Sequence, residues 1–419
     1  MLRALNSKFN KYDYGIMLLI AANAAGGLFA PLTIIRLISI LLIPYLLFKF
    51  EKREVGLPKY VNAFFIVWFL FSILSLGWTP DISTGAKTVF YNISSFIVFA
   101  SIWIFYKKGK SPYLSIIFGW SFLFLFTFPT ALNEFINNVH LEMSFHEGDN
   151  TYIRDEFGQF TLRHFASVTF GNLNGYNVVA CYCLLFVLAG IVKDRKYQLF
   201  GMLIFFAISF VIIMNASRGA FLCLGICVAL FIFFLFRQNK IRSIIFLIII
   251  LAITFLVVYY YNDIFSQIST RIISEKLTED ESRSNIYEKG LILFRDTDFM
   301  GTGIGGLKIT MERMGFRVNA MHNMFFEFLF QYGIIPFIFF ILMLYKITAN
   351  LILSRSKADK FLGWCFLVYS IPLFIINSGY LEHQSLWAYL ASLLCFSQPR
   401  RPIPMRVKLR RPRRNIRHA

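Results

Sequence analysis

Residues 320–333, AMHNMFFEFLFQYG, place a histidine and a carboxylate in a stretch that is otherwise rich in phenylalanine. A neutral histidine such as His322 can take up a proton at physiological pH. Asn323 and Glu327 are four residues apart, so they share one face of the helix that we expect to begin here. A lone histidine in a loop is usually inert, but this one has polar neighbours within an apolar run. The stretch is therefore a candidate for proton transfer.

Charged side chains stand near the ends of other apolar runs. Arg36 lies a few residues into one run, Arg218 opens another in NASRGAFLCLG, and Glu327 lies about one turn into a third. An arginine at the centre of a membrane helix costs about 2.5–3.5 kcal/mol, so its placement is informative. Two interpretations stay open. Either the arginines reach to the membrane surface and Glu327 pairs with one of them, or all three side chains line one cavity open to the outside.

Long apolar runs set the architecture around these residues. The chain of 419 residues is 57% hydrophobic and contains 50 phenylalanines, whereas soluble domains are about 45–50% apolar. The runs are about 18–20 residues long, the length of a helix that crosses about 30 Å of hydrocarbon. This pattern predicts an all-α polytopic membrane protein, because a barrel would show alternating segments of about ten residues. We expect about twelve transmembrane helices, at residues 14–30, 31–49, 60–77, 87–106, 113–131, 174–192, 197–214, 217–236, 242–261, 323–346, 361–377 and 383–397.

The charges follow the positive-inside rule. With twelve spans, 29 of the 42 lysines and arginines fall on the connections of one side, which predicts cytoplasmic N and C termini. The net charge of +19 therefore reflects membrane topology, and no nucleic-acid partner is expected. Residues 1–398 form a single predicted transmembrane domain. The basic tail 399–419 is expected to lie in the cytoplasm on anionic membrane lipids. Between the first two runs, ANAAGGLFAPLT predicts either a tight turn or the kink of one re-entrant segment.

The acidic residues show the complementary distribution. Only five of the 23 aspartates and glutamates lie in the predicted cytoplasmic segments. Most of the others lie in two long loops, at about 132–173 and 262–322, which the same topology places outside. Long ordered loops are usually functional, so we expect the chemistry at the outer face. The six cysteines all lie in apolar runs, so neither a disulfide framework nor a zinc site is expected.

The second external loop contains DESRSNIYEKGLILFRDTDFMGTGIGG at 280–306. Arg283, Tyr287 and Leu291 recur at helical spacing, as do Ile286 and Leu293, which predicts a short amphipathic helix on the membrane. Four glycines follow between residues 301 and 306. They predict either a flexible turn or a backbone that comes close to a phosphate.

Three stretches together resemble the O-antigen ligase and O-antigen polymerase (Wzy-type) family. They are SRGAFL at 217–222, SRSNIYEKGLILF followed by GTGIGG, and HNMFFEFLFQYGII at 322–335, in the family's order around a large external loop. FGNLNGYN at 170–177 is similar to the family's Asn-Pro-Asn stretch, with Leu173 in place of the proline. The resemblance covers about residues 165–395, and the first five spans match only in topology.

The resemblance implies a GT-C-like glycosyltransferase that needs no metal or other cofactor and uses an undecaprenyl-pyrophosphate-linked saccharide as donor. The family's essential positions fall on Arg218, Arg283 and His322. Without a metal, the pyrophosphate leaving group needs cations, and arginine offers a permanent, bidentate charge. His322 would remove the proton of the acceptor hydroxyl, an effect worth about 10²–10⁴ in rate. Asn323 and Glu327 would support His322, and Arg36 is a further candidate for the same cavity. Attack of the acceptor hydroxyl at the anomeric carbon would invert the configuration of that carbon.

The acceptor stays open. A ligase would use lipid A–core and a polymerase would use a lipid-linked repeat unit; the ligase is narrowly favoured because its three essential positions find counterparts. Charged and histidine side chains of the first external loop are expected to help choose the acceptor, namely His140, His146, His164, Arg154 and Arg163. The resemblance also implies a bacterial inner membrane with a periplasmic active site. A flippase or transporter is a candidate from another class, but no internal repeat relates the two halves.

Overall fold

The computed structural model describes residues 8–29, 32–52, 54, 56–140, 152–154, 160–162, 165–237, 240–241, 244, 246–248, 285–315, 321–377 and 379–398. Some features of the sequence analysis lie outside these residues wholly or for the most part. They include Arg283, the predicted span at 242–261, the tail 399–419, and the loop residues His146, Arg163 and His164.

Within the described residues, seven helices are long and apolar enough to cross a membrane, so the mainly helical, polytopic architecture is confirmed. They are α4 (Lys59–Leu74) with η2 (Ser75–Gly77), α5 (Ile82–Lys108), α6 (Pro112–Asn137), α7 (Leu173–Lys193), η4 (Arg195–Tyr197) with α8 (Gln198–Asn215), α9 (Arg218–Phe236) and α14 (Ile334–Leu353). The other helices are α2 (Lys11–Ala21), η1 (Ala22–Ala24), α3 (Ile34–Glu51), α12 (Gly306–Arg313), α13 (Met324–Tyr332), α15 (Lys357–Leu373), η5 (Tyr380–Glu382) and α16 (Gln384–Ser397).

Two short hairpins interrupt the helices. Strands β1 (Gly27–Phe29) and β2 (Leu32–Thr33) form an antiparallel pair between α2 and α3, so ANAAGGLFAPLT makes a tight turn and not the kink of one segment. Strands β3 (Tyr152–Arg154) and β4 (Phe160–Leu162) form a second antiparallel pair.

The predicted span at 323–346 is wrong as a single helix. Gly333 divides it into α13 and α14, because its backbone has φ 82° and ψ 179°, outside the helical region. A Cβ at this position would lie 2.6 Å from the Met300 carbonyl oxygen, so only glycine fits the corner. Glu327 therefore lies in a separate helix of nine residues and not one turn into a span.

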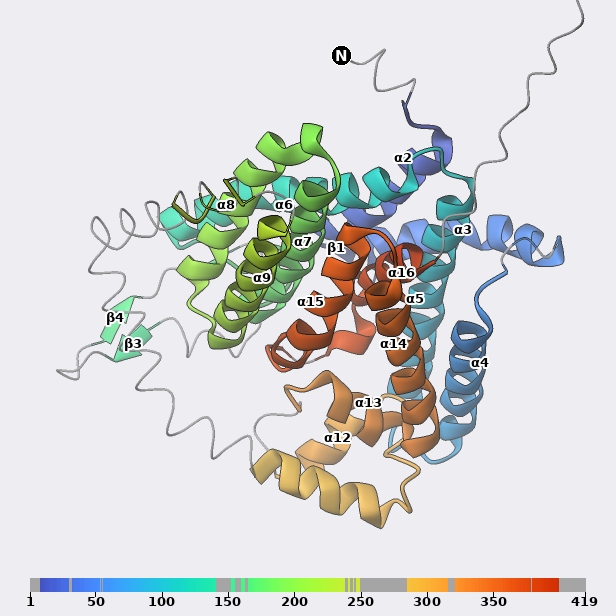
Figure 1. Ribbon diagram of the computed structural model, residues 1–419. Coiled ribbons are helices and arrows are strands. Elements are labelled where there is room, and N and C mark those ends of the chain that lie inside the picture. The colour runs from blue at the N-terminus through green and yellow to red at the C-terminus, as the bar shows by residue number, and fades with distance from the viewer. Residues whose placement is uncertain are drawn as a thin grey trace, which may run out of the picture.

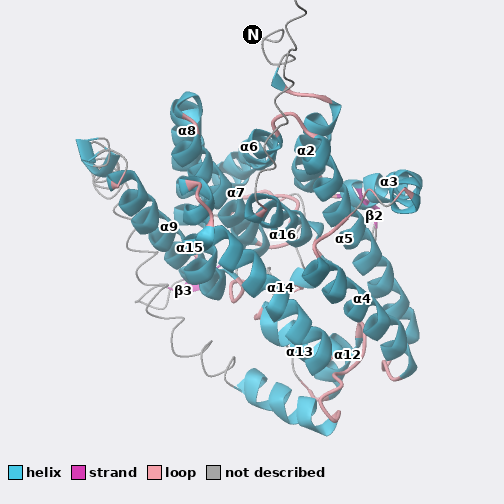
Figure 2. Ribbon diagram, turned by 45° about the vertical axis from the view of Figure 1, so that its right-hand side comes forward, coloured by secondary structure: helices cyan, strands magenta, loops and turns pink. Residues whose placement is uncertain are grey.

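Two central helices are buried along their length. Every residue of α16, and every residue of α7 from Gly175 to Val192, is shielded by protein. α7 packs against α6, α8, α9 and α15, and α16 packs against α5 and α14. Figures 1 and 2 show α12 and α13 together at the end of the molecule away from the N-terminus. The core of the protein is therefore built from two helices that other helices shield from lipid.

Basic connections gather at one end of α5. The Lys108 ammonium and the Lys49 ammonium both pair with Glu54, the latter at 3.0 Å. The buried carboxylate of Asp13 accepts the N–H of Lys110 at 2.8 Å, which fixes the start of α2 beside the α5–α6 turn. Because α5 has 27 residues, its other end lies about 40 Å away along the helix axis.

Residues 285–296 form a helix, as predicted, and its buried face agrees with the predicted residues only in part. Ile286 and Phe294 are buried, whereas Leu291 is 51% exposed. A Cβ at Gly290 would lie 2.5 Å from the Phe330 ring, so the helix packs closely on α13. This helix is therefore held by protein contacts and not only by an apolar face on the membrane.

Candidate functional site

One segment, residues 374–383 after α15, touches the elements that carry most of the predicted site residues. Ile376 packs against Gly219 of α9, and the Phe374 carbonyl accepts the Met324 N–H at 2.9 Å. The Gly379 N–H donates to the Glu327 carboxylate at 2.9 Å. The Glu382 carbonyl accepts a hydrogen bond from the Arg36 guanidinium at 3.1 Å. Arg218 directly precedes Gly219 in the sequence, and His322 lies two residues before Met324. The fold therefore gathers Arg36, Arg218, His322 and Glu327 around the 374–383 segment.

Arg218 is the first residue of α9 and is half-buried. A polar clasp fixes the chain just before it. The Asn215 side-chain oxygen accepts the Ala166 N–H at 2.7 Å, and its amide nitrogen donates to the Asn177 side chain at 3.0 Å. Ala216 then turns the chain in the left-handed region, at φ 50°. The position of Arg218 is thus set by α7 and by the end of the predicted loop 132–173.

His322 is half-buried and has φ 45°, a backbone conformation that few side chains adopt. Asn323 does not lie inside the helix with Glu327, as the sequence analysis expected. It is the N-cap of α13, and its side-chain oxygen accepts the N–H groups of Phe325 at 3.0 Å and Phe326 at 3.4 Å. Asn323 therefore supports His322 by ending the loop at a fixed place, because capping fixes where the helix begins.

The Glu327 side chain is 6% exposed. Among the described residues, its hydrogen-bond partner is a backbone N–H group and not an arginine side chain. The Gly379 N–H donates to its carboxylate at 2.9 Å and 3.1 Å from the two oxygens. α13 is not one of the seven candidate spanning helices. Burial raises the pKa of Glu327 to about 8, although the N–H groups of Gly379 and Tyr380 oppose this rise. The carboxyl is therefore largely protonated near neutral pH and joins α13 to the 374–383 segment.

Arg36 points into the protein and not to the membrane surface. Its guanidinium lies 3.8 Å from the centre of the Tyr91 ring on α5 and donates to the Glu382 carbonyl oxygen. Burial raises the pKa of the Glu382 carboxyl, and the charges of Arg36 and Lys308 oppose that rise. That Arg36, Arg218 and Glu327 line one cavity stays a prediction.

Sequence reasoning missed His383, which ends the 374–383 segment. Its ring reaches solvent, yet the surrounding protein removes much of its hydration. This loss of solvation, together with the charge of Arg36, lowers the pKa of His383 to about 4. The ring is therefore neutral at pH 7. A histidine near an acid in SGYLEHQ was the available sequence signal, but nothing local showed that Arg36 would lie beside it.

The glycines between 301 and 306 are buried against the turn between α4 and α5. Ser75 Oγ accepts the Ile304 N–H at 3.0 Å, and the Ile304 carbonyl accepts the Thr79 hydroxyl at 2.8 Å. Gly303 has φ 84°, and a Cβ there would lie 2.9 Å from the Ser75 carbonyl oxygen. The close approach that glycine permits is made to the protein's own backbone. This packing role is neither of the two that the sequence predicts.

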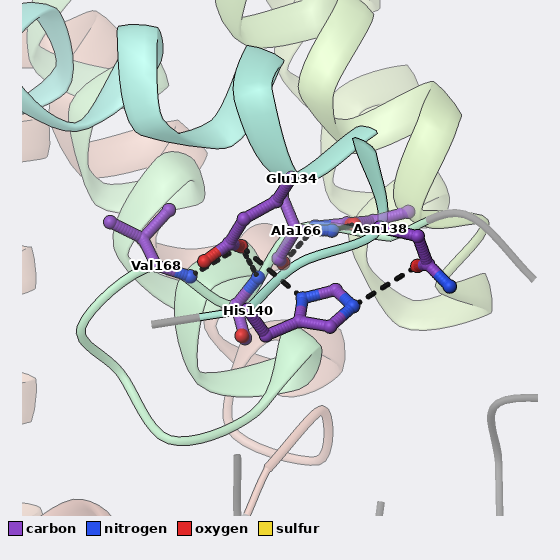
Figure 3. Close-up of polar contacts among 7 residues, drawn as sticks. Glu134, Asn138, His140, Ala166 and Val168 are labelled. Atoms are coloured by element: carbon purple, nitrogen blue, oxygen red, sulfur yellow. Dashed lines mark hydrogen bonds and ion pairs between the residues drawn. The ribbon is translucent and has the colours of Figure 1, made fainter. Parts of the chain in front are cut away.

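A buried carboxylate anchors the end of the first external loop, as Figure 3 shows. Glu134 accepts the N–H groups of Ser167 at 2.7 Å and Val168 at 2.9 Å. The His140 ring lies 3.6 Å from the same carboxylate and stacks on Phe165 at 4.0 Å between ring centres. His140 was expected to help choose the acceptor, but its side chain is 2% exposed, so that expectation is wrong. His146, His164 and Arg163 lie outside the described residues, and no statement is made about the side chain of Arg154.

The arrangement combines a cation with a proton acceptor. Arg218 and His322 approach one segment of chain, with Arg36 and His383 at its other end. Within the described ranges, no group of three or more histidine, cysteine, aspartate or glutamate side chains could hold a metal ion. The cations that this arrangement offers to an anionic substrate are arginines, which can bind phosphate oxygens in a bidentate manner.

Comparison with known proteins supports the same region. Residues 203–341 match the model of the family described as O-antigen ligase, which confirms the resemblance that the motifs predict. Among curated proteins, the chain is similar to the teichuronic acid biosynthesis protein TuaE of Bacillus subtilis strain 168, with 22% identity over 320 residues. That alignment covers 71% of this chain and 63% of the relative, so the chain spans less than two thirds of the relative's length. The matched family segment contains both Arg218 and His322.

Proposed function

We propose that this protein is a membrane glycan transferase of the O-antigen ligase class, which moves a saccharide from undecaprenyl pyrophosphate to a sugar hydroxyl of lipid A–core. One observation carries the proposal. Arg218 and His322 lie in the matched family segment, and both approach the 374–383 segment although they are far apart in the sequence. Displacement of pyrophosphate by a hydroxyl requires a cation for the leaving group and an acceptor for the hydroxyl proton.

In the proposed reaction, the acceptor oxygen attacks the anomeric carbon while the bond from that carbon to the pyrophosphate oxygen breaks. The anomeric configuration is therefore inverted. His322 takes the hydroxyl proton, and the pyrophosphate leaves with the bonding electron pair. Arg218 balances the charge that develops on the leaving group, together with Arg283, which lies outside the described residues. Such stabilisation is often the largest contribution to catalysis, and here it is proposed to need no metal.

The proposal includes a place in the cell. The protein would have about twelve spans in a GT-C-like arrangement in a bacterial inner membrane, with both termini in the cytoplasm. Lys49, Lys108 and Glu54 gather at one end of α5, whereas the buried glycine stretch 301–306 lies at the other end. This separation supports a basic cytoplasmic side and a periplasmic active site under the positive-inside rule.

A polymerase is the second candidate, with the same donor and a lipid-linked repeat unit as acceptor. The similarity to a protein named for teichuronic acid biosynthesis favours keeping it beside the ligase. A polymerase would use the same cation and base, because the reacting bonds are the same. A flippase is a third candidate, and it would move the lipid-linked glycan without forming a new glycosidic bond.

A transfer assay in nanodiscs tests the proposal. Purified protein receives polyprenyl-pyrophosphate-linked saccharide in EDTA, with and without lipid A–core, and products are read by mass. A product that forms only with lipid A–core supports the ligase, and lengthening of the lipid-linked glycan alone supports the polymerase. If neither product forms with donors of several sugar types, the transferase proposal is contradicted.

A further inference from the structure

A small pocket lies where the two central buried helices begin. The first turns of α7 and α16 meet there, because Gly175, Val178 and Val179 of α7 face Ser385 and Leu386 of α16 across it. Aromatic side chains close the pocket on other sides, namely those of Phe170, Tyr182 and Tyr380. The remaining wall is formed by Asn377 and His383 of the 374–383 segment. The pocket therefore adjoins the segment that gathers the candidate residues.

Three polar side chains of this pocket have no partner within the described part of the chain. Asn377 and Ser385 are each 6% exposed, and neither side chain makes a hydrogen bond to a described residue. The His383 ring also makes none, although its backbone N–H donates to the Tyr380 carbonyl. His383 is exposed, and Asn377 and Ser385 line the free space of the pocket, so each of the three side chains can bond to a molecule that enters it.

The chemistry of the lining indicates what that molecule is. The first turn of α16 has no side-chain cap, and its Leu386 N–H already donates to the His383 carbonyl. The N–H groups before Leu386, like the amide of Asn377, are donors. The neutral ring of His383 and the hydroxyl of Ser385 can each accept a hydrogen bond as well as donate one. The free space suits a group of about the size of one water molecule. A sugar hydroxyl fits these conditions, because it is small and both donates and accepts.

We propose that this pocket receives one hydroxyl group of the acceptor saccharide, and that Asn377, His383 and Ser385 hold it by hydrogen bonds. The inference rests on the proposed function and extends it to acceptor recognition. The hydroxyl held here is not the one that reacts. Its binding turns the sugar ring so that another hydroxyl is presented to the anomeric carbon of the donor.

The test combines protein variants with altered acceptors. Asn377→Leu and His383→Leu are compared with wild-type protein and with Gln398→Leu, which also replaces a side-chain amide but stands about 21 Å away, at the other end of α16. The probes are lipid A–core and the lipid-linked repeat unit, each also prepared as a set of derivatives that lack a single hydroxyl. KM for acceptor, KM for donor and kcat are measured in nanodiscs. Unfolding temperature is recorded for every variant.

We expect each pocket variant to raise the KM for acceptor about tenfold, with KM for donor unchanged, because a binding hydrogen bond is lost. One deoxy acceptor should show the same loss with wild-type protein and no further loss with the variants, since both changes remove the same contact. Folded variants with a wild-type KM for acceptor, or losses that simply add, contradict the inference. If wild-type protein makes no product with any acceptor, the proposed function fails and the inference with it.

Discussion

The Gly379 backbone N–H donates to the buried carboxylate of Glu327, at 2.9 Å and 3.1 Å from its two oxygens. This bond joins α13, which begins beside His322, to the segment that also holds Arg36. The two residues are 52 positions apart in the sequence. Removal of the contact would free one wall of the candidate site from the other, so we expect Glu327 to position α13 against the 374–383 segment.

Glu327 should make stability depend on pH. Its pKa is raised from 4.5 to about 8 by burial, so between these values the folded protein keeps a proton that the unfolded chain releases. The stabilisation is therefore complete below the lower value and is lost as the pH rises through the higher one. We expect the unfolding temperature of wild-type protein in nanodiscs to fall between about pH 5 and about pH 8. Glu327→Gln should show a smaller fall, whereas the exposed control Glu312→Gln should behave as wild type. An equal fall in Glu327→Gln would exclude this carboxyl as the source.

His322→Ala should lower kcat by about 10²–10⁴ with little change in KM for donor, because a general base acts in the chemical step. The transfer assay with mass readout measures both constants. His418→Ala, a histidine replacement in the basic tail, is the matched control and should retain full activity. Full glycan transfer by His322→Ala would remove the base assignment.

Arg218→Lys keeps the positive charge but loses the bidentate fork. We expect the transfer rate to fall at least about tenfold, because lysine binds phosphate oxygens as a point charge. Arg295→Lys is the control, since this arginine lies in the helix at 285–296 with its side chain 73% exposed. Comparison of the two variants in the nanodisc assay separates the geometry of the guanidinium from loss of an arginine as such. Wild-type rates for Arg218→Lys would argue against bidentate binding.

Gly303→Ala should destabilise the protein more than Gly315→Ala. Both glycines have positive φ, at 84° and 80°, so both variants carry the backbone strain of about 1–2 kcal/mol. Only at Gly303 would the new Cβ meet Ser75 and Thr79, whereas at Gly315 it would meet no atom within 4 Å. The crowding should add about 1–3 kcal/mol, which thermal unfolding in nanodiscs can resolve. Equal unfolding temperatures would show that the contact with the α4–α5 turn yields easily.

Glu134→Leu should destabilise the end of the first external loop. The N–H groups of Ser167 and Val168 would lose their acceptor, at a cost of about 1–3 kcal/mol for each buried unpaired group. Hydrogen exchange at residues 165–168 should speed up, and the unfolding temperature should fall. Glu51→Leu, at an exposed position of α3, should change neither quantity. Unchanged exchange in Glu134→Leu would mean that other contacts hold this stretch.

Two kinds of information were local and could be predicted from the sequence. The apolar runs gave the membrane class, because the length of a helix that crosses the membrane depends only on consecutive residues. Arg218 and His322 could also be recognised from the local sequence, since each is a polar residue in a short apolar motif. The helix at 285–296 was also predicted, and its buried face was predicted in part, at Ile286 but not at Leu291. These inferences needed no knowledge of which segments meet.

The pairing of distant segments was decided by the tertiary structure. Gly333 breaks the predicted span because the Met300 carbonyl occupies the space of a side chain, and this neighbour is 33 residues away in the sequence. Arg36 meets Glu382 across 346 residues. The 374–383 segment carries no motif, yet it collects the candidate residues, because burial and hydrogen bonding depend on which groups become neighbours when the chain packs. A sequence read along the chain lists those groups, but only the packed helices bring them together.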